Sequence, residues 1–381
     1  VIANNTVIVA STGRWALNVQ NGATNTTVFN NAFYNYGRDY YSYVWPRDGC
    51  YALWPLIRLG YQDEAKSFFE FCVDTMAPEG YMMHKYQPDR TVGSSWHSLI
   101  QDGLEELPIQ EDETAMVIVL LDEYAAKFGD KEFVAKVYEL FVVPCANFLA
   151  TFVDEDTGLP HASYDLWEER FLTTAYTVAT VYKALLSAVA LAEQLGRPVP
   201  AIWEERAAQF LERSHIFYNP EDGTIRKGFK LTDGNLAFDN TLDASSAFGV
   251  LGFGYFRTEH QDKIRDSFEA MQTRLGCPVS PFALARHEND GYFRVDQSGP
   301  GNPWVITSLW LAQYHIRFTG DLAKTEAILG WLESLKVNNG MLPEQIHPND
   351  GTPVSVSPLV WSHAEYISTL LDLETKKNAH S

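Results

Sequence analysis

Residues 164–170 read Tyr-Asp-Leu-Trp-Glu-Glu-Arg and place three carboxylates, an indole and a guanidinium within seven positions. A tryptophan next to a glutamate, as in Trp167 and Glu168, can keep water from the carboxyl group and raise its pKa. A carboxylic acid with a raised pKa can donate a proton near neutral pH. The same acidic residues would also suit the first turn of a helix, where the helix dipole favours negative charge. The stretch by itself leaves both interpretations open.

A second candidate carboxylate is Glu344, in the stretch Gly-Met-Leu-Pro-Glu-Gln-Ile-His at 340–347. Two carboxyl groups that face each other across a cleft are the minimal machinery for hydrolysing a glycosidic bond. One must be protonated to release the leaving-group oxygen, and the other must be ionised to act on water or on the sugar. Glu168 and Glu344 are far apart in the sequence, so only a closed ring would bring them together. A solvated loop acid is the alternative interpretation of Glu344.

A sugar also needs groups that hold its hydroxyls. Carboxylates and guanidinium groups do so through paired, charge-assisted hydrogen bonds, and Arg47, Asp48 and Arg286 fit that role. Trp45 and Trp304 offer flat faces against which a sugar ring can lie. A surface ion pair that caps the first helix is the alternative interpretation of Arg47 and Asp48.

Other chemistries have less support in the sequence. The chain shows no Gly-rich phosphate loop after a strand and no G-x-S-x-G nucleophile elbow. Ser362 and His363 are neighbours in a predicted helix and point to different faces, so we interpret them as structural. The ten histidines and four cysteines lack the spacing of a metal site. We therefore predict buried free thiols, no catalytic metal and no cofactor.

The composition of the 381 residues favours a small, neutral partner. Hydrophobic residues make up 46% and aromatic residues 13%, enough for one large domain or two ordinary ones. The net charge of −20 argues against nucleic acid or an anionic membrane as a partner. No apolar run approaches the roughly 20 residues of a membrane span, and no signal peptide is visible. We expect an oligosaccharide-binding, cytoplasmic protein, with secretion and the oligomeric state left open.

Hydrophobic residues recur with the period of a helix over eleven segments. The predicted helices span 49–59, 64–76, 112–128, 131–152, 172–195, 201–217, 244–253, 260–275, 304–318, 322–337 and 359–373. Short turns alternate with long loops along this series, so antiparallel packing would gather the long loops at one end. The residues singled out above all fall in or beside these long loops.

This alternation predicts an all-α (α/α)6 barrel, in which six helical hairpins form a ring with its functional loops on one face. A linear array of helical repeats is the competing architecture, but the hairpins show no fixed period. We expect an N-terminal extension at 1–40 with a short strand at 7–10, the barrel at 41–375 and a flexible tail at 376–381. A twelfth helix could come from the first 40 residues or from the irregular region 218–239.

Six short motifs occur in a fixed order along nearly the whole chain. They are Tyr-Ser-Tyr-Val-Trp-Pro-Arg-Asp at 41–48, Gln-Glu-Asp-Glu-Thr at 110–114, Tyr-Asp-Leu-Trp-Glu-Glu at 164–169, Arg-His-Glu-Asn-Asp at 286–290, Gly-Asn-Pro-Trp at 301–304 and Pro-Glu-Gln at 343–345. In type and order they resemble the motifs of the glucoamylase family, glycoside hydrolase family 15, and in particular bacterial or archaeal glucoamylases and isomaltose glucohydrolases. One motif would be weak support, but six in order are specific.

The resemblance implies an (α/α)6 barrel and an exo-acting hydrolase that releases β-glucose, with inversion, from the non-reducing ends of α-glucosides. It implies that Glu168 is the general acid and that Glu344 is the general base that activates water. The substrate contacts it implies are Arg47, Asp48 and Arg286 around the terminal glucose, Glu169 toward the next sugar, Trp167 and Trp45 along the pocket, and Tyr41 near the base and its water.

The sequence departs from the family pattern at both ends of the barrel. Residues 1–40 have room only for the connecting end of the β-sandwich found in bacterial and archaeal relatives, and no starch-binding module follows. This favours short maltose- or isomaltose-type oligosaccharides and leaves the linkage open. Residues 84–110 do not align with the family's loop, which leaves the role of Trp96 open. A trehalase-type member, an inverting phosphorylase with a phosphate pocket in place of Glu344, and a non-catalytic sugar-binding toroid remain alternatives.

Overall fold

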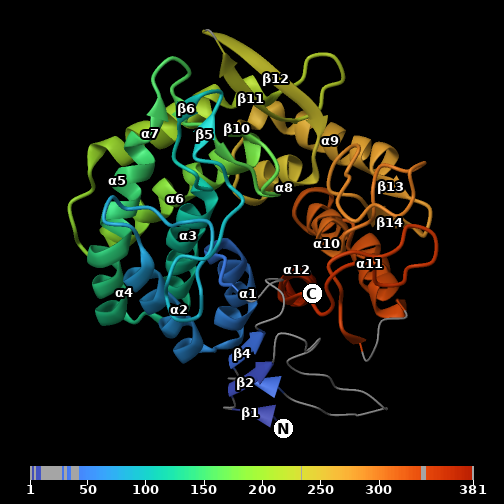
Figure 1. Ribbon diagram of the computed structural model, residues 1–381, viewed down its shortest axis with the longest axis horizontal. Helices are drawn as coiled ribbons and strands as arrows, with labels where there is room; N and C mark the ends of the chain where they lie inside the picture. The colour runs from blue at the N-terminus through green and yellow to red at the C-terminus, as the bar shows by residue number, and fades with distance from the viewer. Residues whose placement is uncertain are drawn as a thin grey trace.

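The computed structural model describes residues 43–232, 234–335 and 340–379, together with four short strands near the N-terminus. Six helices form a closed inner ring (Figure 1). They are α1 (Pro46–Leu59), α3 (Glu111–Phe128), α6 (Ala175–Gln194), α8 (Ala244–Gly252), α10 (Val305–Tyr314) and α12 (Val360–Asn378). Each inner helix packs against the next one in this order, and α12 packs back against α1, which closes the ring.

The helices between these inner ones pack on the outside of the ring. They are α2 (Gln62–Thr75), α4 (Lys131–Val137), α5 (Val143–Thr151), α7 (Ala201–Glu212), α9 (Gln261–Arg274) and α11 (Leu322–Ser334). A π-helical turn, Tyr138–Val142, joins α4 to α5. This alternation of inner and outer helices confirms the predicted (α/α)6 barrel and excludes a linear array.

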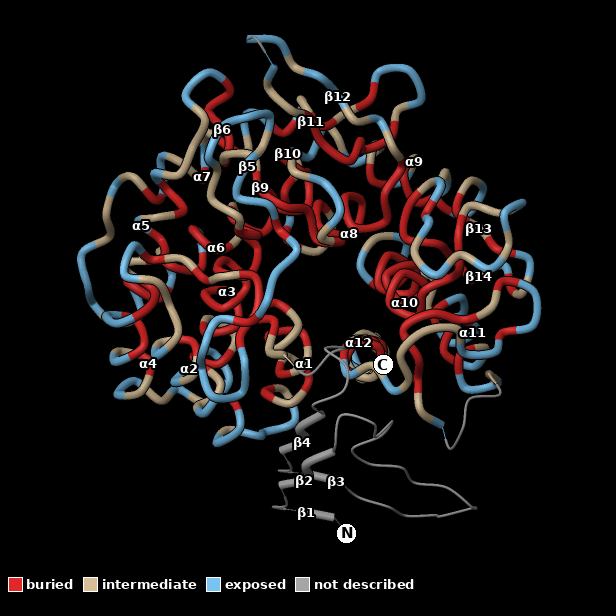
Figure 2. Tube along the Cα trace, in the orientation of Figure 1, coloured by how far each residue is buried: buried red, intermediate tan, exposed pale blue. Residues whose placement is uncertain are grey.

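The burial of each helix follows its place in the barrel. Figure 2 shows buried residues concentrated along the inner helices α3, α6, α8 and α10. Every residue of α10 is buried, whereas α2 buries only Ala65, Phe69 and Cys72 and faces solvent elsewhere. A helix that is apolar all round needs neighbours on all sides, and an amphipathic helix needs them on one. The hydrophobic pattern of each helix therefore indicates whether the helix belongs to the inner or the outer ring.

Glycines end the helices at the tight turns. Gly60 follows α1 with φ 97° and Gly129 follows α3 with φ 62°. Both values lie in the left-handed region, which a residue without a Cβ enters at little cost. Gly129 allows α3 to reverse directly into α4, so the long connections are left to the opposite end of the ring.

A four-stranded antiparallel sheet lies over one part of the ring, in the order β12-β11-β10-β9. Its strands are β9 (Ser163–Tyr164), β10 (Phe171–Thr174), β11 (Arg226–Thr232) and β12 (Asn235–Leu242). The interpretation of residues 218–239 as irregular, or as the source of a twelfth helix, is therefore wrong. The helix predicted from residue 172 begins at Ala175, because Thr174 is extended and accepts a hydrogen bond from the Thr177 N–H as a cap.

The smaller elements are two-stranded sheets and short helical turns. The sheets pair β1 (Ile2–Ala3) with β3 (Val28–Phe29), β2 (Thr6–Val9) with β4 (Ala32–Asn35), β5 (Ile100–Gln101) with β6 (Leu104–Glu105), β7 (Val153–Asp154) with β8 (Leu159–Pro160), and β13 (Gly276–Cys277) with β14 (Ser280–Leu284). The turns are the 3-10 segments Arg213–Phe217 and Thr258–His260 and the π segment His315–Thr319. β2 overlaps the strand expected at 7–10, and α12 continues through residues 376–378 of the predicted tail.

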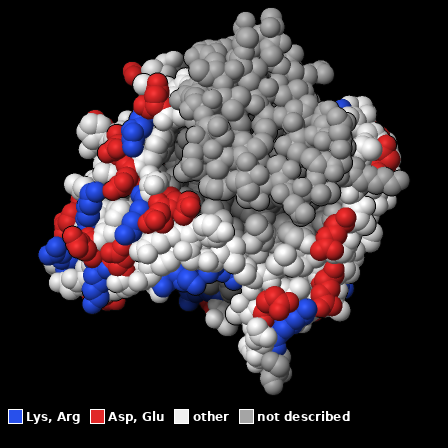
Figure 3. All heavy atoms as spheres, turned by 90° about the horizontal axis from the view of Figure 1, so that it is seen from below, with Lys and Arg blue, Asp and Glu red and all other residues white. Residues whose placement is uncertain are grey.

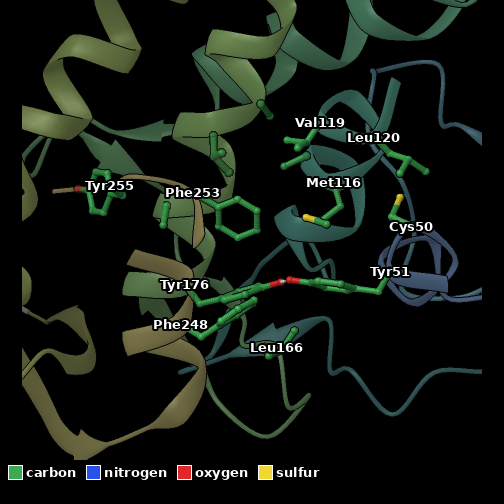
Figure 4. Packing of buried hydrophobic residues seen from close by; sticks show 14 of the residues in the cluster. Cys50, Tyr51, Met116, Val119, Leu120, Leu166, Tyr176, Phe248, Phe253 and Tyr255 are labelled. Atoms are coloured by element: carbon green, nitrogen blue, oxygen red, sulfur yellow. Dashed lines mark hydrogen bonds between the residues drawn. The ribbon is translucent and has the colours of Figure 1, made fainter. Parts of the chain in front are cut away.

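Aromatic rings fill the centre of the ring of helices. The hydroxyls of Tyr51 on α1 and Tyr176 on α6 are joined by a 2.9 Å hydrogen bond across the barrel (Figure 4). Tyr51 stacks on Trp361 of α12 with ring centroids 4.6 Å apart, and Phe248 of α8 stacks on Trp310 of α10 at 4.5 Å. The barrel is therefore a packed core and not a channel. The four cysteines are buried and unpaired, as predicted.

Two segments are long and apolar enough to cross a membrane, which the sequence analysis did not detect: 131–151, covering α4 to α5, and Ala175–Gln194. Both are largely buried in the barrel, as expected of core helices. The side of the molecule in Figure 3 carries basic and acidic side chains interspersed over the described residues. The ion pairs Lys66–Asp130 and Lys136–Glu70 join α2 to α4 and to the residue before it.

Candidate active site

A cavity of about 520 Å³ opens at the end of the ring where the inner helices begin. It is lined by nine of the ten predicted site residues: Trp45, Arg47, Asp48, Trp167, Glu168, Glu169, Arg286, Trp304 and Glu344. The tenth, Tyr41, lies outside the described residues. The remaining lining residues were not predicted as ligands: Lys85, Ser94, Trp96, Leu166, Tyr292, Leu359 and Trp361.

The loop that carries Glu168 is a tight turn and not the start of a helix. The N–H of Glu168 donates to the Asp165 carbonyl at 2.9 Å, and the Asp165 carboxylate accepts from the N–H groups of Glu169 and Arg170 at 2.8 and 2.9 Å. Glu168 has φ 64°, in the left-handed region. A residue with a Cβ pays roughly 1–3 kcal/mol for such a backbone. The hydrogen bonds that Asp165 accepts offset that cost and hold the carboxyl group of Glu168 toward the cavity.

A buried lysine from β11 fixes this turn from behind. The Lys227 ammonium lies 2.6 Å from an Asp165 carboxylate oxygen and 3.2 Å from one of Asp243. Asp243 also accepts a 3.0 Å hydrogen bond from the Trp167 indole N–H. We call the turn at residues 165–170 the acid turn. The hairpin β11–β12, which the sequence did not predict, thus supplies the cation that joins the acid turn to α8. Burial alone would lower the pKa of Lys227, but the two carboxylates raise it.

Glu168 lines the cavity among charged and aromatic side chains. Burial raises its pKa, against the opposing charges of Arg47 and Lys85. Its carboxyl group lies 2.8 Å from Nε2 of the buried His84 and 3.9 Å from the Arg47 guanidinium. The neighbouring Trp167 turns its N–H to Asp243, so its polar edge is engaged and its ring lines the cavity.

Arg47 is buried, which excludes its interpretation as part of a surface ion pair. Its guanidinium lies 3.0 Å from Asp48, 3.1 Å from Asp112 and 3.3 Å from Glu113. Burial alone would lower its pKa, but the carboxylates of Glu113 and Asp112 raise it well above the usual value. Asp112 and Glu113 belong to the second of the six motifs, at 110–114, whose role could not be predicted from the sequence because its partner Arg47 lies on another helix.

Arg286 stands on the other side of the cavity. It makes a two-pronged pair with Asp290 at 2.8 and 2.6 Å and a further 2.6 Å bond to Glu169. Its guanidinium lies 4.6 Å from the centre of the Trp304 ring, within reach of a cation–π interaction. Burial would raise the pKa of Glu169, but the hydrogen bond from His287 and the charge of Arg286 lower it to about 2. Glu169 is therefore ionised at neutral pH, and its pKa is shifted in the opposite direction to that of its neighbour Glu168.

Glu344 is buried at 3% exposure, which excludes its interpretation as a solvated loop acid. Its N–H donates to the Val356 carbonyl at 2.9 Å. The preceding residues are held from α12: the Ser362 hydroxyl donates to the Pro343 carbonyl at 2.8 Å, and His363 Nε2 accepts from the Leu342 N–H at 3.0 Å. Ser362 and His363 thus bind the loop and not each other, which agrees with their interpretation as structural.

The segment between α2 and α3, whose role was left open in the prediction, forms one wall of the cavity. Lys85 is buried, and its ammonium lies 4.4, 5.0 and 4.0 Å from the ring centres of Tyr43, Trp45 and Trp96. Trp96 is 60% exposed although it lines the cavity. A large exposed ring at the rim of a pocket is suited to contact a bound molecule.

Two groups of side chains have possible metal-ligand atoms within 4.8 Å of one another: His84, His97 and Glu168, and Glu169, His287 and Asp290. Hydrogen bonds and ion pairs already join members of both groups, with His84 at 2.8 Å from Glu168 and His287 at 3.1 Å from Glu169. These bonds account for the short distances without an ion. The absence of a metal and of a cofactor stays a prediction.

This protein combines a closed ring of helical hairpins with one cavity that is lined by carboxyl groups and tryptophans. This combination is typical of glycosidases of the (α/α)6-barrel class. The chain belongs to glycosyl hydrolases family 15, whose sequence model matches residues 4–371. This confirms the family resemblance that the six motifs indicated.

Curated relatives agree with this assignment. The chain is 27% identical over 345 residues to an uncharacterized glycosyl hydrolase of Methanocaldococcus jannaschii, covering 86% of this chain and 50% of that protein. It is 24% identical over 353 residues to a trehalase of Mycobacterium tuberculosis, covering 87% of this chain and 48% of that protein. The chain thus spans about half the length of these relatives.

Solved structures share the fold. A bacterial glucoamylase complexed with acarbose superposes with a TM-score of 0.71 at 20% identity, over 90% of this chain and 50% of that one. A glycosidase variant in complex with glucose gives a TM-score of 0.69 at 20% identity, over 88% of this chain and 89% of that one. At this identity the similarity establishes the (α/α)6 barrel and leaves the substrate to be argued from the site.

Proposed function

We propose that this chain is an exo-acting, inverting α-glucoside hydrolase that releases β-D-glucose from the non-reducing ends of short α-gluco-oligosaccharides of the maltose or isomaltose type. One observation carries the proposal: Glu168 and Glu344, from distant loops, line a single cavity with five tryptophans. A volume of about 520 Å³ lies within the range of small-molecule sites, roughly 300–1,000 Å³.

In this proposal Glu168 protonates the leaving-group oxygen and Glu344 activates the water that attacks the anomeric carbon from the opposite face. Burial raises the pKa of Glu168, which supports the role of an acid. Arg47, Asp48 and Arg286 would hold the terminal glucose through charged hydrogen bonds, with Trp45, Trp167 and Trp304 around its faces. Glu169 would contact the second sugar, and Tyr41 would lie near Glu344 and its water.

The proposal is tested by incubating the protein with maltose, isomaltose and trehalose and following the anomer of the released glucose by NMR. An inverting enzyme releases β-glucose first, and its carboxyl groups are about 6.5–9.5 Å apart, which leaves room for water. Initial release of α-glucose would indicate retention and refute the assigned roles. Absence of turnover on every α-glucoside would support a non-catalytic toroid.

We expect Glu168→Gln and Glu344→Gln each to lower kcat by about 10²–10⁴-fold with substrate binding largely kept, because each removes one proton-transfer group. The wild-type profile of kcat/KM against pH should be bell-shaped, since the two groups must hold opposite protonation states. Glu155→Gln is the control, because Glu155 is exposed on the loop before the acid turn. A glutamine variant with near-wild-type kcat would remove that residue from its role.

A trehalase-type activity is the second candidate, favoured by the similarity to the Mycobacterium tuberculosis trehalase. Cleavage of trehalose in preference to maltose and isomaltose would establish it. An inverting phosphorylase is less supported, because the guanidinium groups of Arg47 and Arg286 are already paired with carboxylates and Glu344 occupies the place of a phosphate pocket. Glucose release that needs no phosphate would exclude it.

A further inference from the structure

Two buried amides, Asn302 and Gln345, lie behind the candidate base Glu344. They belong to the fifth and sixth motifs, at 301–304 and 343–345, but neither was predicted as a site residue. Both side chains are fully buried, and neither is among the residues that line the cavity. Any effect that these amides have on the reaction must therefore pass through another residue.

The backbone around Glu344 is held by the start of α10. The Val305 N–H donates to the Glu344 carbonyl at 3.2 Å, and the Ile346 N–H donates to the Pro303 carbonyl at 3.0 Å. These bonds fix the peptide groups, whereas the direction of the Glu344 carboxyl group depends on side-chain contacts. One such contact comes from Gln345, whose Nε2 donates to Glu344 Oε2 at 3.4 Å. This bond is long, as hydrogen bonds of catalytic groups often are before a substrate binds.

The two ends of the Asn302 amide are identified by the backbone groups that they face. Its Oδ1 accepts from the Val295 N–H at 3.1 Å, and its Nδ2 donates to the Phe293 carbonyl at 2.8 Å. A backbone N–H can only donate and a carbonyl can only accept, so the opposite orientation would lose both bonds. Nδ2 has a second hydrogen, which it donates to Gln345 Oε1 at 2.7 Å.

The orientation of Asn302 in turn determines that of Gln345. Because Asn302 presents an N–H to it, Gln345 must turn its carbonyl oxygen toward Asn302, and its NH2 group then faces Glu344. A reversed Gln345 would place two NH2 groups against each other and a carbonyl oxygen against the carboxyl group. The hydrogen bonds therefore run in one direction, from the backbone at Val295 through both amides to Glu344.

We propose that Asn302 is a positioning residue that fixes the direction of the Gln345 amide, so that Gln345 offers a donor to the carboxylate of the candidate base. A donor stabilises the ionised form that a base requires, whereas a carbonyl oxygen in the same place would disfavour it. This inference rests on the proposed function, because Asn302 has this role only if Glu344 activates the water.

The first variant, Gln345→Met, removes the donor and keeps a side chain of similar length. On a disaccharide that the wild type cleaves, we expect kcat to fall roughly tenfold to a hundredfold, the range of one hydrogen bond to a charged group. KM should change less than about twofold, because Gln345 does not line the cavity. Asn219→Leu is the control, because Asn219 is also buried and does not line the cavity. Its kcat and KM should equal those of the wild type.

The second variant tests whether Asn302 acts through Gln345. Asn302→Leu keeps a similar shape and removes the N–H that orients Gln345, so we expect kcat to fall roughly threefold to thirtyfold. In the Gln345→Met background the same substitution should lower kcat less than about twofold, because the amide on which Asn302 acts is gone. A purely structural role of Asn302, through its bonds to Phe293 and Val295, would lower kcat equally in both backgrounds.

Three results overturn the inference: an unchanged kcat in Gln345→Met, an unchanged kcat in Asn302→Leu, or an equal loss from Asn302→Leu in both backgrounds. If Asn302→Leu does not fold, Asn302→Ser makes the same test, because serine has no atom at the position of the amide nitrogen. Failure of the wild type to cleave any α-glucoside would instead refute the proposed function, so the two failures are distinguishable.

Discussion

Two neighbouring glutamates in the acid turn carry opposite electrostatic environments. Glu168 lies 2.8 Å from Nε2 of His84, and burial raises its pKa. Glu169 lies against Arg286 and His287, which lower its pKa to about 2 despite its partial burial. Titratable pairs whose pKa values are driven apart often divide acid and anion roles within one site. The turn geometry makes this division, because successive side chains leave a tight turn in different directions.

The depressed pKa of Glu169 makes a prediction about stability in acid. A carboxylate with a folded pKa of about 2 and an ordinary value of 4.5 stabilises the protein above pH 4.5, and this contribution disappears as the pH falls through 2. We expect the stability gap between the wild type and Glu169→Gln to be constant between pH 5 and 6 and to shrink progressively below pH 4.5. Urea unfolding followed by circular dichroism measures the gap at each pH.

The control for this prediction is Glu155→Gln, in which an exposed glutamate changes by the same atoms. Its difference from the wild type should be small at every pH. A gap for Glu169→Gln that stays the same from pH 5 to pH 2.5 would contradict the ion pairing with Arg286.

At the scale of elements, the hairpin β11–β12 matters because it carries one buried cation into the site. Lys227 in β11 is 3% exposed and lies between Asp165 of the acid turn and Asp243 at the start of α8. Removal of one partner from a buried ion pair leaves an unpaired charge. The hairpin thus couples the position of the turn that carries Glu168 to the inner ring.

We expect Lys227→Met to destabilise the protein by about 3–5 kcal/mol, because both carboxylates stay buried without a counter-charge. Lys230→Met in the same strand is the matched control. The ion pair of Lys230 with Asp102 is solvent-exposed, so its loss should cost less than about 1 kcal/mol. Chemical denaturation of both variants at pH 7 gives the comparison, and equal losses would show that the buried position of Lys227 has no special importance.

The sequence predicted the helices well and this hairpin poorly, for reasons visible in the residues. A helix is predicted from a hydrophobic period of 3.6 residues that repeats over several turns. The predicted segments lie within a few residues of those observed. Residues 226–242 carry an Asp-Gly turn signal at 233–234, between strands with polar, alternating residues. Such a signal indicates a hairpin, which the sequence-based predictions did not include. The segment 131–152 is broken by a π turn just before Pro144, which lacks the N–H of a regular helix.

The residues of the site could also be predicted only in part. The residues that carry motifs, such as Glu168 and Glu344, could be selected because their types suit one chemistry and the family resemblance gave their order. The residues that hold them could not, because His84 and Lys227 have ordinary neighbours in the sequence. These two residues, and Glu113 of the motif at 110–114, gain their partners only when distant segments meet. Long-range pairing leaves no local pattern.

At the scale of the whole molecule, the cavity exists because the ring closes. The final helix α12 packs against α1 through the stacking of Trp361 on Tyr51 and a 2.8 Å ion pair between Arg58 and Asp372. Trp361 also lines the cavity, and Ser362 holds the loop before Glu344. The contact that closes the barrel and the contact that places the candidate base therefore belong to one helix.

This arrangement predicts the result of removing α12. In a linear array of repeats the loss of a terminal helix costs only its own contacts, so the remainder would stay folded. In a closed ring, a chain that ends at residue 358 exposes the buried faces of α1 and α10 and frees the Glu344 loop. We expect such a chain to be insoluble or to lack a cooperative thermal transition, whereas a chain that ends at Asn378 should unfold as the full-length protein does. Thermal melts by circular dichroism decide this, and a folded, cooperative 1–358 chain would contradict the structural role assigned to ring closure.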